Sequence, residues 1–383
     1  MNFLKAAVLV AGLAWTTEGR AQIAPVLSST VGVDWTSNAE ASPVGASDIV
    51  ITQSHSVGIA GGGEGKALRG SLTLEETRFG RLWRENDWTA TLALDGETAL
   101  GAGAGLRGSL SLAYSEEGQV LATLAGPLGA VTPSLSGRAQ VRLETRLHDA
   151  AVGIDLDYAG ERPGDTRLEA DIFPKERIRP VTDTVTVGLD MAHPVTDTLL
   201  LLGRAQYVTV LVSPDEQARF GRVPVDIGRV AAGVEIASPG AVVGLRGGFD
   251  AIFSRFPTML VPYGLAEGRI GLGDGVELRA AFRVGADTED PADGVVDWRL
   301  KARGSIVFTP TSGTELELAA FAAQRYSPLH DITIETETGA ELLARLALAG
   351  GLMLEGRARY RYVEALAGDF SETRLGLRLA AVL

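Results

Sequence analysis

Basic and acidic side chains recur at every second position in the last third of the chain. The basic ones are Arg279 and Arg283, then Arg299, Lys301 and Arg303, then Arg357, Arg359 and Arg361, and finally Arg374 and Arg378. Glu315 and Glu317, followed by Glu335 and Glu337, lie between these basic groups. A spacing of two places such side chains on one face of a β-strand. Ladders of opposite charge would set up a field that orients polar solutes. The alternative is that the charges pair with one another and fill an enclosed space.

Two glycine-rich stretches resemble nucleotide-binding loops only superficially. The stretch AGGGEGKA at 60–67 has Ala60 where a phosphate-binding loop needs glycine and Ala67 where it needs serine or threonine. The stretch GAGAGLRG at 101–108 is followed by a pattern of period two rather than by a helix. We interpret both stretches as turns between strands.

Histidine and cysteine offer little for catalysis or metal binding. The chain has four histidines, which show no metal-ligand spacing, and no cysteine, which also excludes disulfides. The sequence therefore predicts no metal and no cofactor. A hydrolase built on a barrel would need serine or aspartate to meet histidine across strands, and no sequence pattern marks such a meeting.

The charge balance excludes one class of partner. Asp and Glu number 48 against 35 Lys and Arg, which gives a formal net charge of -13, and no basic run is present. Nucleic acid is therefore excluded as a partner.

Residues 1–21 have the features of a signal peptide. Lys5 ends a short basic region, residues 6–14 form a compact apolar run, and Gly19-Arg20-Ala21 supplies small residues for cleavage after Ala21. The apolar run is about half of the roughly 20 residues that a spanning helix needs. We expect export across the inner membrane, with residues 22–383 as the mature domain.

The mature domain alternates between apolar and polar residues almost throughout. In 276–286, for example, Val276, Leu278 and Phe282 alternate with charged residues, and the same pattern covers 294–308 and 352–362. Helical periodicity is not evident, so the sequence predicts an all-β protein. Segments of about ten residues suit tilted membrane strands better than the shorter strands of soluble sheets.

Connection lengths and aromatic positions favour a membrane barrel over a soluble sandwich. Short and long connections alternate along the chain. The short turns lie at 238–240, 273–275, 309–313 and 349–351, and the longer links lie at 213–225, 286–294, 326–331 and 364–370. Large aromatic residues share the apolar parity and lie next to the longer links, as an interface girdle requires. They are Trp35, Trp88, Tyr114, Tyr158, Tyr207, Phe253, Trp298, Tyr326, Tyr360 and Tyr362.

We therefore predict a transmembrane antiparallel up-and-down β-barrel in the bacterial outer membrane. The apolar side chains of each strand face lipid, and the charged side chains face the interior, because ionised groups are highly unfavourable in the hydrocarbon of the bilayer. The strand count is about 18, with 16 and 20 as alternatives, because five prolines between 116 and 180 interrupt the alternation. The short turns and both ends of the mature chain would be periplasmic.

The end of the chain resembles the C-terminal assembly signal of outer-membrane proteins. Leu375, Leu377 and Leu379 alternate with Arg374, Gly376 and Arg378. Such signals usually end in Phe or Trp, whereas this chain ends in Leu383. Outer-membrane lipid and the assembly machinery are thus expected partners.

Two stretches carry a resemblance to a known family. VGVDWTSNAEASPVGASDIVITQSHSVGI places an aromatic-Thr-Ser-Asn hairpin tip before Ser-Asp-Ile, and GSIVFTPTSGTELELAAFAAQRYS has a Thr-Pro-Thr turn between two strands. With these stretches the chain resembles the Gram-negative β-barrel porin 2 family, which is often linked to exopolysaccharide or capsule export. The resemblance implies an outer-membrane barrel without catalytic residues.

Three functions follow as hypotheses. The first is a porin-like channel for polar or charged solutes, with a role in polysaccharide export and with the basic and acidic ladders lining the pore. The second is a barrel plugged by its own charge pairs and loops that acts as a structural component of an envelope assembly. The third is an outer-membrane hydrolase.

Overall fold

The computed structural model describes residues 22–382 apart from 44, 64, 102, 124–125, 169–174 and 288–294. The predicted signal peptide, residues 1–21, and Leu383 lie outside the described residues. The strands are β1 (Gln22–Thr36), β2 (Asp48–Gly63), β3 (Lys66–Phe79), β4 (Asp87–Gly101), β5 (Ala104–Thr123), β6 (Gly126–Leu147), β7 (Ala150–Pro163), β8 (Arg167–Leu168), β9 (Thr182–Pro194), β10 (Leu199–Leu211), β11 (Val225–Ser238), β12 (Ala241–Phe253), β13 (Met259–Gly273), β14 (Val276–Ala286), β15 (Trp298–Thr311), β16 (Thr314–Ser327), β17 (Ile332–Ala347), β18 (Leu352–Ala365) and β19 (Phe370–Val382). The helical segments are α2 (Pro214–Phe220), η1 (Trp83–Glu85) and η2 (Ala349–Gly351).

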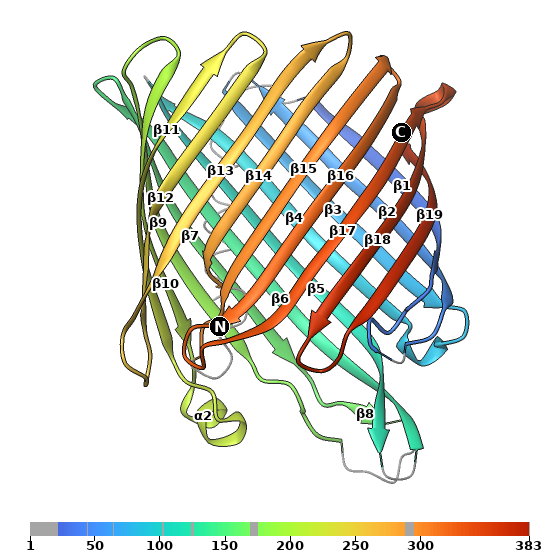
Figure 1. The fold of residues 1–383 in the computed structure, drawn as a ribbon. Helices are drawn as coiled ribbons and strands as arrows, with labels where there is room; N and C mark the ends of the chain where they lie inside the picture. Colours follow the sequence, from blue (N-terminus) through green and yellow to red (C-terminus); the bar gives the residue numbers. More distant parts are fainter. Residues whose placement is uncertain are drawn as a thin grey trace.

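All the strands form one antiparallel sheet that closes on itself (Figure 1). Eighteen long strands each pair with the next strand along the chain, while the two-residue β8 adds only to the side of β6. The barrel closes between the first and last strands, where Ser28 to Thr36 pair with Val382 to Arg374. The predicted up-and-down barrel of about 18 strands is confirmed.

The two ends of the barrel differ in the length of their connections. Short turns join β2 to β3, β11 to β12 and β13 to β14 at the upper end of Figure 1, and the longer links lie at the lower end. The Asp274-Gly275 turn shows why the upper connections are tight, since both residues adopt positive φ angles of 48° and 76°. A two-residue hairpin of this type matches the twist of its flanking strands.

The proline-rich region 116–180 contains β6 and β7, and the paired ends of β5 and β6 extend the barrel wall at its lower end. β5 and β6 have 20 and 22 residues and pair as far as Thr123 and Gly126. Pro133 does not interrupt β6, and its carbonyl accepts a hydrogen bond from the Gly164 amide at 2.7 Å. The prolines of this region therefore do not reduce the number of strands, because β5 and β6 stay paired beyond Pro133.

A short helix departs from the prediction that the mature chain has none. Helix α2 occupies seven residues of the link between β10 and β11. The Ser213 hydroxyl accepts from the Glu216 amide at 3.3 Å, and Gly221 ends the helix in the left-handed conformation. Among the described residues, no helix is long and apolar enough to cross a bilayer.

Candidate functional site

The outer face of the barrel is a continuous apolar surface. Val33, Leu245 and Leu318 point away from the interior and are 48%, 51% and 57% exposed. Side chains of this size and number would be unfavourable against water, so they require lipid. The predicted apolar, lipid-facing parity is confirmed.

An aromatic girdle surrounds the end of the barrel that carries the long links. Trp35, Trp88 and Tyr207 are exposed on the outer face at that end, as predicted. The rings of Trp298 and Tyr326 meet edge to face with centroids 6.4 Å apart, and the Trp298 indole donates to the Pro262 carbonyl at 3.0 Å. Such rings combine an apolar body with a polar edge, which suits the membrane interface.

The inner faces of β15 to β19 and β1 form what we call the paired wall. Six of its arginines contact a carboxylate on a neighbouring strand. The distances are 2.9 Å for Arg303–Glu317, 2.7 Å for Arg345–Glu315, 2.8 Å for Arg357–Glu341, 2.9 Å for Arg359–Glu337, 2.6 Å for Arg361–Glu372 and 2.8 Å for Arg374–Asp34. The basic and acidic ladders predicted from the sequence therefore do meet, and they neutralise one another along this wall.

The remaining predicted pore-lining residues divide into paired and unpaired side chains. Arg299 lies 2.7 Å from Asp287, Arg279 contacts Glu277 on its own strand, and Arg378 lies 3.9 Å from Asp34. Arg283 and Lys301 differ, since no carboxylate oxygen of the described residues lies within 4.0 Å of either cation. Both side chains are exposed to the interior of the barrel.

Several inner-wall charges were not singled out from the sequence. Asp34 is 2% exposed and sits at the closing seam between β1 and β19, where Arg374 and Arg378 reach it. Asp190 of β9 is shared by Arg142, Arg204 and Arg246 at 3.6 to 4.0 Å. Their inward parity was readable in the sequence. Their partners were not, because pairing depends on the register between strands.

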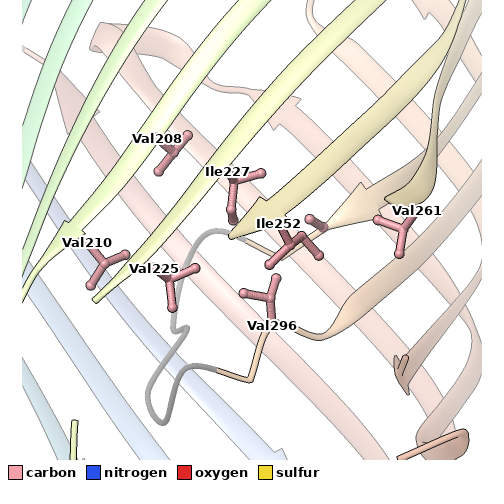
Figure 2. Close-up of a cluster of buried hydrophobic side chains, with 8 residues drawn as sticks. Val208, Val210, Val225, Ile227, Ile252, Val261 and Val296 are labelled. Carbon is pink, nitrogen blue, oxygen red and sulfur yellow. The ribbon is translucent and has the colours of Figure 1, made fainter. Parts of the chain in front are cut away.

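A second region of the inner face is apolar, which the sequence did not predict. The inward-facing residues at the lower ends of β10 to β13 bury one another against two residues from either side of the β14–β15 link (Figure 2). We call this cluster the apolar corner. It consists of Val208, Val210, Val225, Ile227, Ile252, Val261, Ala286 and Val296. Val296 is 0% exposed and contacts the strands from the interior of the barrel (Figure 2).

A buried ion pair adjoins the apolar corner. Arg229 and Asp250 are 5% and 0% exposed, and two hydrogen bonds of 2.6 and 2.9 Å join them. The Ala286 amide also donates to Asp250 at 2.7 Å, and the Arg229 guanidinium lies 4.2 Å from the centre of the Tyr263 ring. Burial of the two charges is tolerated because the guanidinium and both carboxylate oxygens are hydrogen-bonded. The pair thus fixes the point where the β14–β15 link leaves β14.

Cavities follow the inner wall on both sides of the barrel. One of about 930 Å³ is lined by charged residues of β3 to β10, including Arg107, Arg142 and Asp155. Another of about 570 Å³ is lined by β10 to β17 and contains Arg283, Lys301 and Phe321. Eighteen strands enclose more space than side chains fill, so such spaces are expected in a barrel of this width.

A contact between serine and histidine side chains on the outer face bears on the hydrolase hypothesis. A hydrogen bond of 2.9 Å joins the Ser29 hydroxyl to His55 Nδ1 beside an apolar hollow that contains Leu72 and Leu74. In the described part of the chain no carboxylate bonds to His55, so the third group that orients a catalytic histidine is missing from this pair. Within the same residues, no cluster of three His, Asp or Glu suits a metal ion.

Comparison with known proteins finds similarity in fold and none in sequence family. No family model and no curated protein matches the sequence. A ferric enterobactin receptor (PfeA) mutant from Pseudomonas aeruginosa aligns with TM-score 0.51 and 9% identity over 93% of this chain and 80% of its own. The siderophore receptor PirA from Pseudomonas aeruginosa gives TM-score 0.51 and 9% identity over 95% and 81%. The ferripyoverdine receptor of the Pseudomonas aeruginosa outer membrane gives 0.52 and 10% over 90% of this chain but only 57% of its own.

The fold is that of an outer-membrane β-barrel. At such low identity the likeness extends to the fold and to nothing finer. Together with the apolar outer face and the aromatic girdle, it locates the chain in a bacterial outer membrane.

Proposed function

We propose that this protein forms a pore for polar and charged solutes across the outer membrane. The observation that carries the proposal is the direction of the ion pairs on the inner wall. Among the described residues, each ion pair between strands joins strands no more than three places apart around the barrel, as in Arg246–Asp190. The charges therefore line the wall and do not bridge the interior from one side to the other.

The rival hypothesis is a barrel plugged by its own charge pairs and loops. A plug made of charge pairs needs side chains that meet across the interior, and an 18-strand barrel is wide enough to leave an aqueous channel between side chains that stay on the wall. The polar cavities of about 930 and 570 Å³ support the open arrangement. A solute would meet charged groups in both cavities, which is the environment that a polar solute needs.

The wider role follows the same proposal. The resemblance to the β-barrel porin 2 family supports polysaccharide export as one task of the pore. The last strand, β19, completes the barrel against β1, and it is the segment that outer-membrane assembly machinery would recognise during insertion.

Single-channel recording in a planar bilayer tests the pore directly. The natural chain has no cysteine, so one introduced thiol reports one position. Ser136 of β6 lines an inner cavity, and its neighbour Leu135 is 48% exposed on the outer face. We expect stable conductance steps from Ser136→Cys that shrink when a charged, water-soluble thiol reagent is added.

Leu135→Cys is the matched control, because its thiol would face lipid and resist the same reagent. Heat-modifiable migration on a gel establishes that each variant is folded. A folded barrel that gives a silent bilayer would overturn the pore and favour the plugged barrel. Equal block at both positions would overturn the assignment of the two faces.

A further inference from the structure

Two cations lie opposite one another on the inner wall, and neither forms an ion pair with any residue that the structure describes. Arg283 of β14 lies directly opposite Lys301 of β15 in the strand register. Directly opposed side chains have Cβ atoms about 4.5–5.5 Å apart, and like charges at this position destabilise a sheet. Neither cation has an ion-pair or hydrogen-bond partner among the described residues, so no direct contact within that part of the chain offsets the repulsion.

The other directly opposed cations of the described strands lie near carboxylates. The directly opposed pairs are Arg107–Arg142, Arg269–Arg279, Arg299–Arg325 and Arg359–Arg374. In each of these, at least one member has a carboxylate within 4.0 Å, such as Glu277 beside Arg279 or Asp297 beside Arg325. Among the described strands, Arg283 and Lys301 are thus the directly opposed cations of which neither has a carboxylate within 4.0 Å.

The surroundings of these two cations form a cavity with an apolar side. The cavity of about 570 Å³ is lined by five cationic side chains and two carboxylates, Glu267 and Glu337. Phe321 is an inward-facing aromatic residue on its wall, and Gly339 makes room for it, because a Cβ at Gly339 would lie 2.4 Å from the ring. The Arg359 guanidinium lies 4.8 Å from the centre of the same ring.

We infer that Arg283 and Lys301 form a binding site for an organic anion inside the pore. The ligand class is a small ring compound that bears a carboxylate or phosphate group. The guanidinium fork of Arg283 and the ammonium group of Lys301 bind the oxyanion, and Phe321 contacts the ring of the solute. The inference rests on the proposed pore and adds to it the charge and class of the solute.

Block of single-channel current measures this binding. Glucuronate and glucose 6-phosphate are the probes, and neutral glucose is the reference compound. We expect both anions to block the wild-type channel at concentrations at least tenfold below any block by glucose. In Arg283→Ala/Lys301→Ala, block by both anions weakens at least tenfold while the conductance steps persist. A weaker effect on one anion alone distinguishes a carboxylate site from a phosphate site.

Arg279→Ala is the matched control, because it removes a cation from the same strand that already contacts Glu277. This variant is expected to bind the anions like the wild type. The urea midpoint of the double variant should equal or exceed the wild-type value, because the removed charges repel one another. Unchanged anion block in the double variant, or equal loss in Arg279→Ala, would overturn the site while channel steps in both variants leave the pore intact.

Discussion

The paired wall and the apolar corner are built from the same alternating pattern but stabilise the barrel in different ways. On the paired wall, half-exposed arginines such as Arg303 (40%) meet carboxylates across a strand boundary in contact with water. In the apolar corner, valine and isoleucine side chains exclude water and enclose the neighbouring ion pair of Arg229 and Asp250. The difference teaches that the inner face of one barrel serves two purposes. One part presents charge to the interior of the barrel, and the other packs Ala286 and Val296 against the wall.

The largest difference between the two regions should appear when one carboxylate is removed from each. Asp250→Ala leaves Arg229 buried without its carboxylate partner, and breaking a buried pair costs about 3–5 kcal/mol of unfolding free energy. Glu317→Ala on the paired wall leaves the Arg303 guanidinium in contact with water, so we expect the free energy of unfolding to fall by about 1 kcal/mol or less. Urea unfolding in detergent micelles measures both values. Similar losses would show that the two regions do not differ in the way described here.

A smaller effect is expected when the apolar corner itself is loosened. Val296→Ala removes two methyl groups from a fully buried site, which costs about 2 kcal/mol. The hydrogen bond from the Asp287 amide to the Asp297 carbonyl, 2.7 Å long, should then open more often. Hydrogen exchange at the Asp287 amide reports that opening.

The matched control for this prediction lies on the outer face. Val230 belongs to β11 and is 69% exposed to lipid, so Val230→Ala removes the same methyl groups without creating a cavity. Its exchange at Asp287 should stay at the wild-type rate. Faster exchange in both variants would mean that Val296 does not anchor the link.

The smallest effect is expected in the link between β3 and β4, where several carboxylates lie near one another. Burial, and then the charges of Glu40, Asp87 and Asp48, raise the pKa of Glu85 above its ordinary value of 4.5. A carboxyl group with a raised pKa in the folded state costs stability when it is ionised. This cost is present at neutral pH and disappears as the pH falls below the unfolded value.

Glu85→Gln should therefore stabilise the link between β3 and β4 at pH 7 by less than about 1 kcal/mol. At about pH 4 the variant and the wild type should be alike. Hydrogen exchange at the Glu85 amide, which donates to the Leu82 carbonyl at 2.8 Å, measures the difference. Glu76→Gln is the contrasting variant, since Glu76 contacts Arg78 at 2.7 Å and its loss should bring no gain. A destabilised link in Glu85→Gln at pH 7 would contradict the prediction.

Much of the candidate site was predictable because parity is a local property. Arg357 and Arg359 face inward for the same reason that Tyr360 and Tyr362 face lipid, namely a repeat of two residues along one strand. The partner of Arg357 was not predictable. Glu341 lies on a different strand, and its distance of 2.8 Å follows from a register that the alternation leaves open.

The apolar corner shows where the sequence pattern was insufficient. Val208 and Val210 share the inward parity of Arg204, yet they are 3% and 2% exposed. The sequence gives no sign of what covers them, because other members of the cluster, such as Ile252 and Val296, are far away along the chain and join it only when the strands have paired. Short-range alternation therefore predicted a polar interior where the folded chain has an apolar one.

The sequence by itself determined the fold class, the two faces, the girdle and the approximate number of strands. These features follow from a repeat of two, from strand length and from the cost of exposing charge to hydrocarbon. Only the tertiary structure decided which charges neutralise one another, which two opposed cations have no carboxylate of the described residues within 4.0 Å, and where Val296 packs against the inner wall. The physical reason is that ion pairs and buried contacts act over a few ångströms, and those distances exist only after strands distant in sequence have been brought into register.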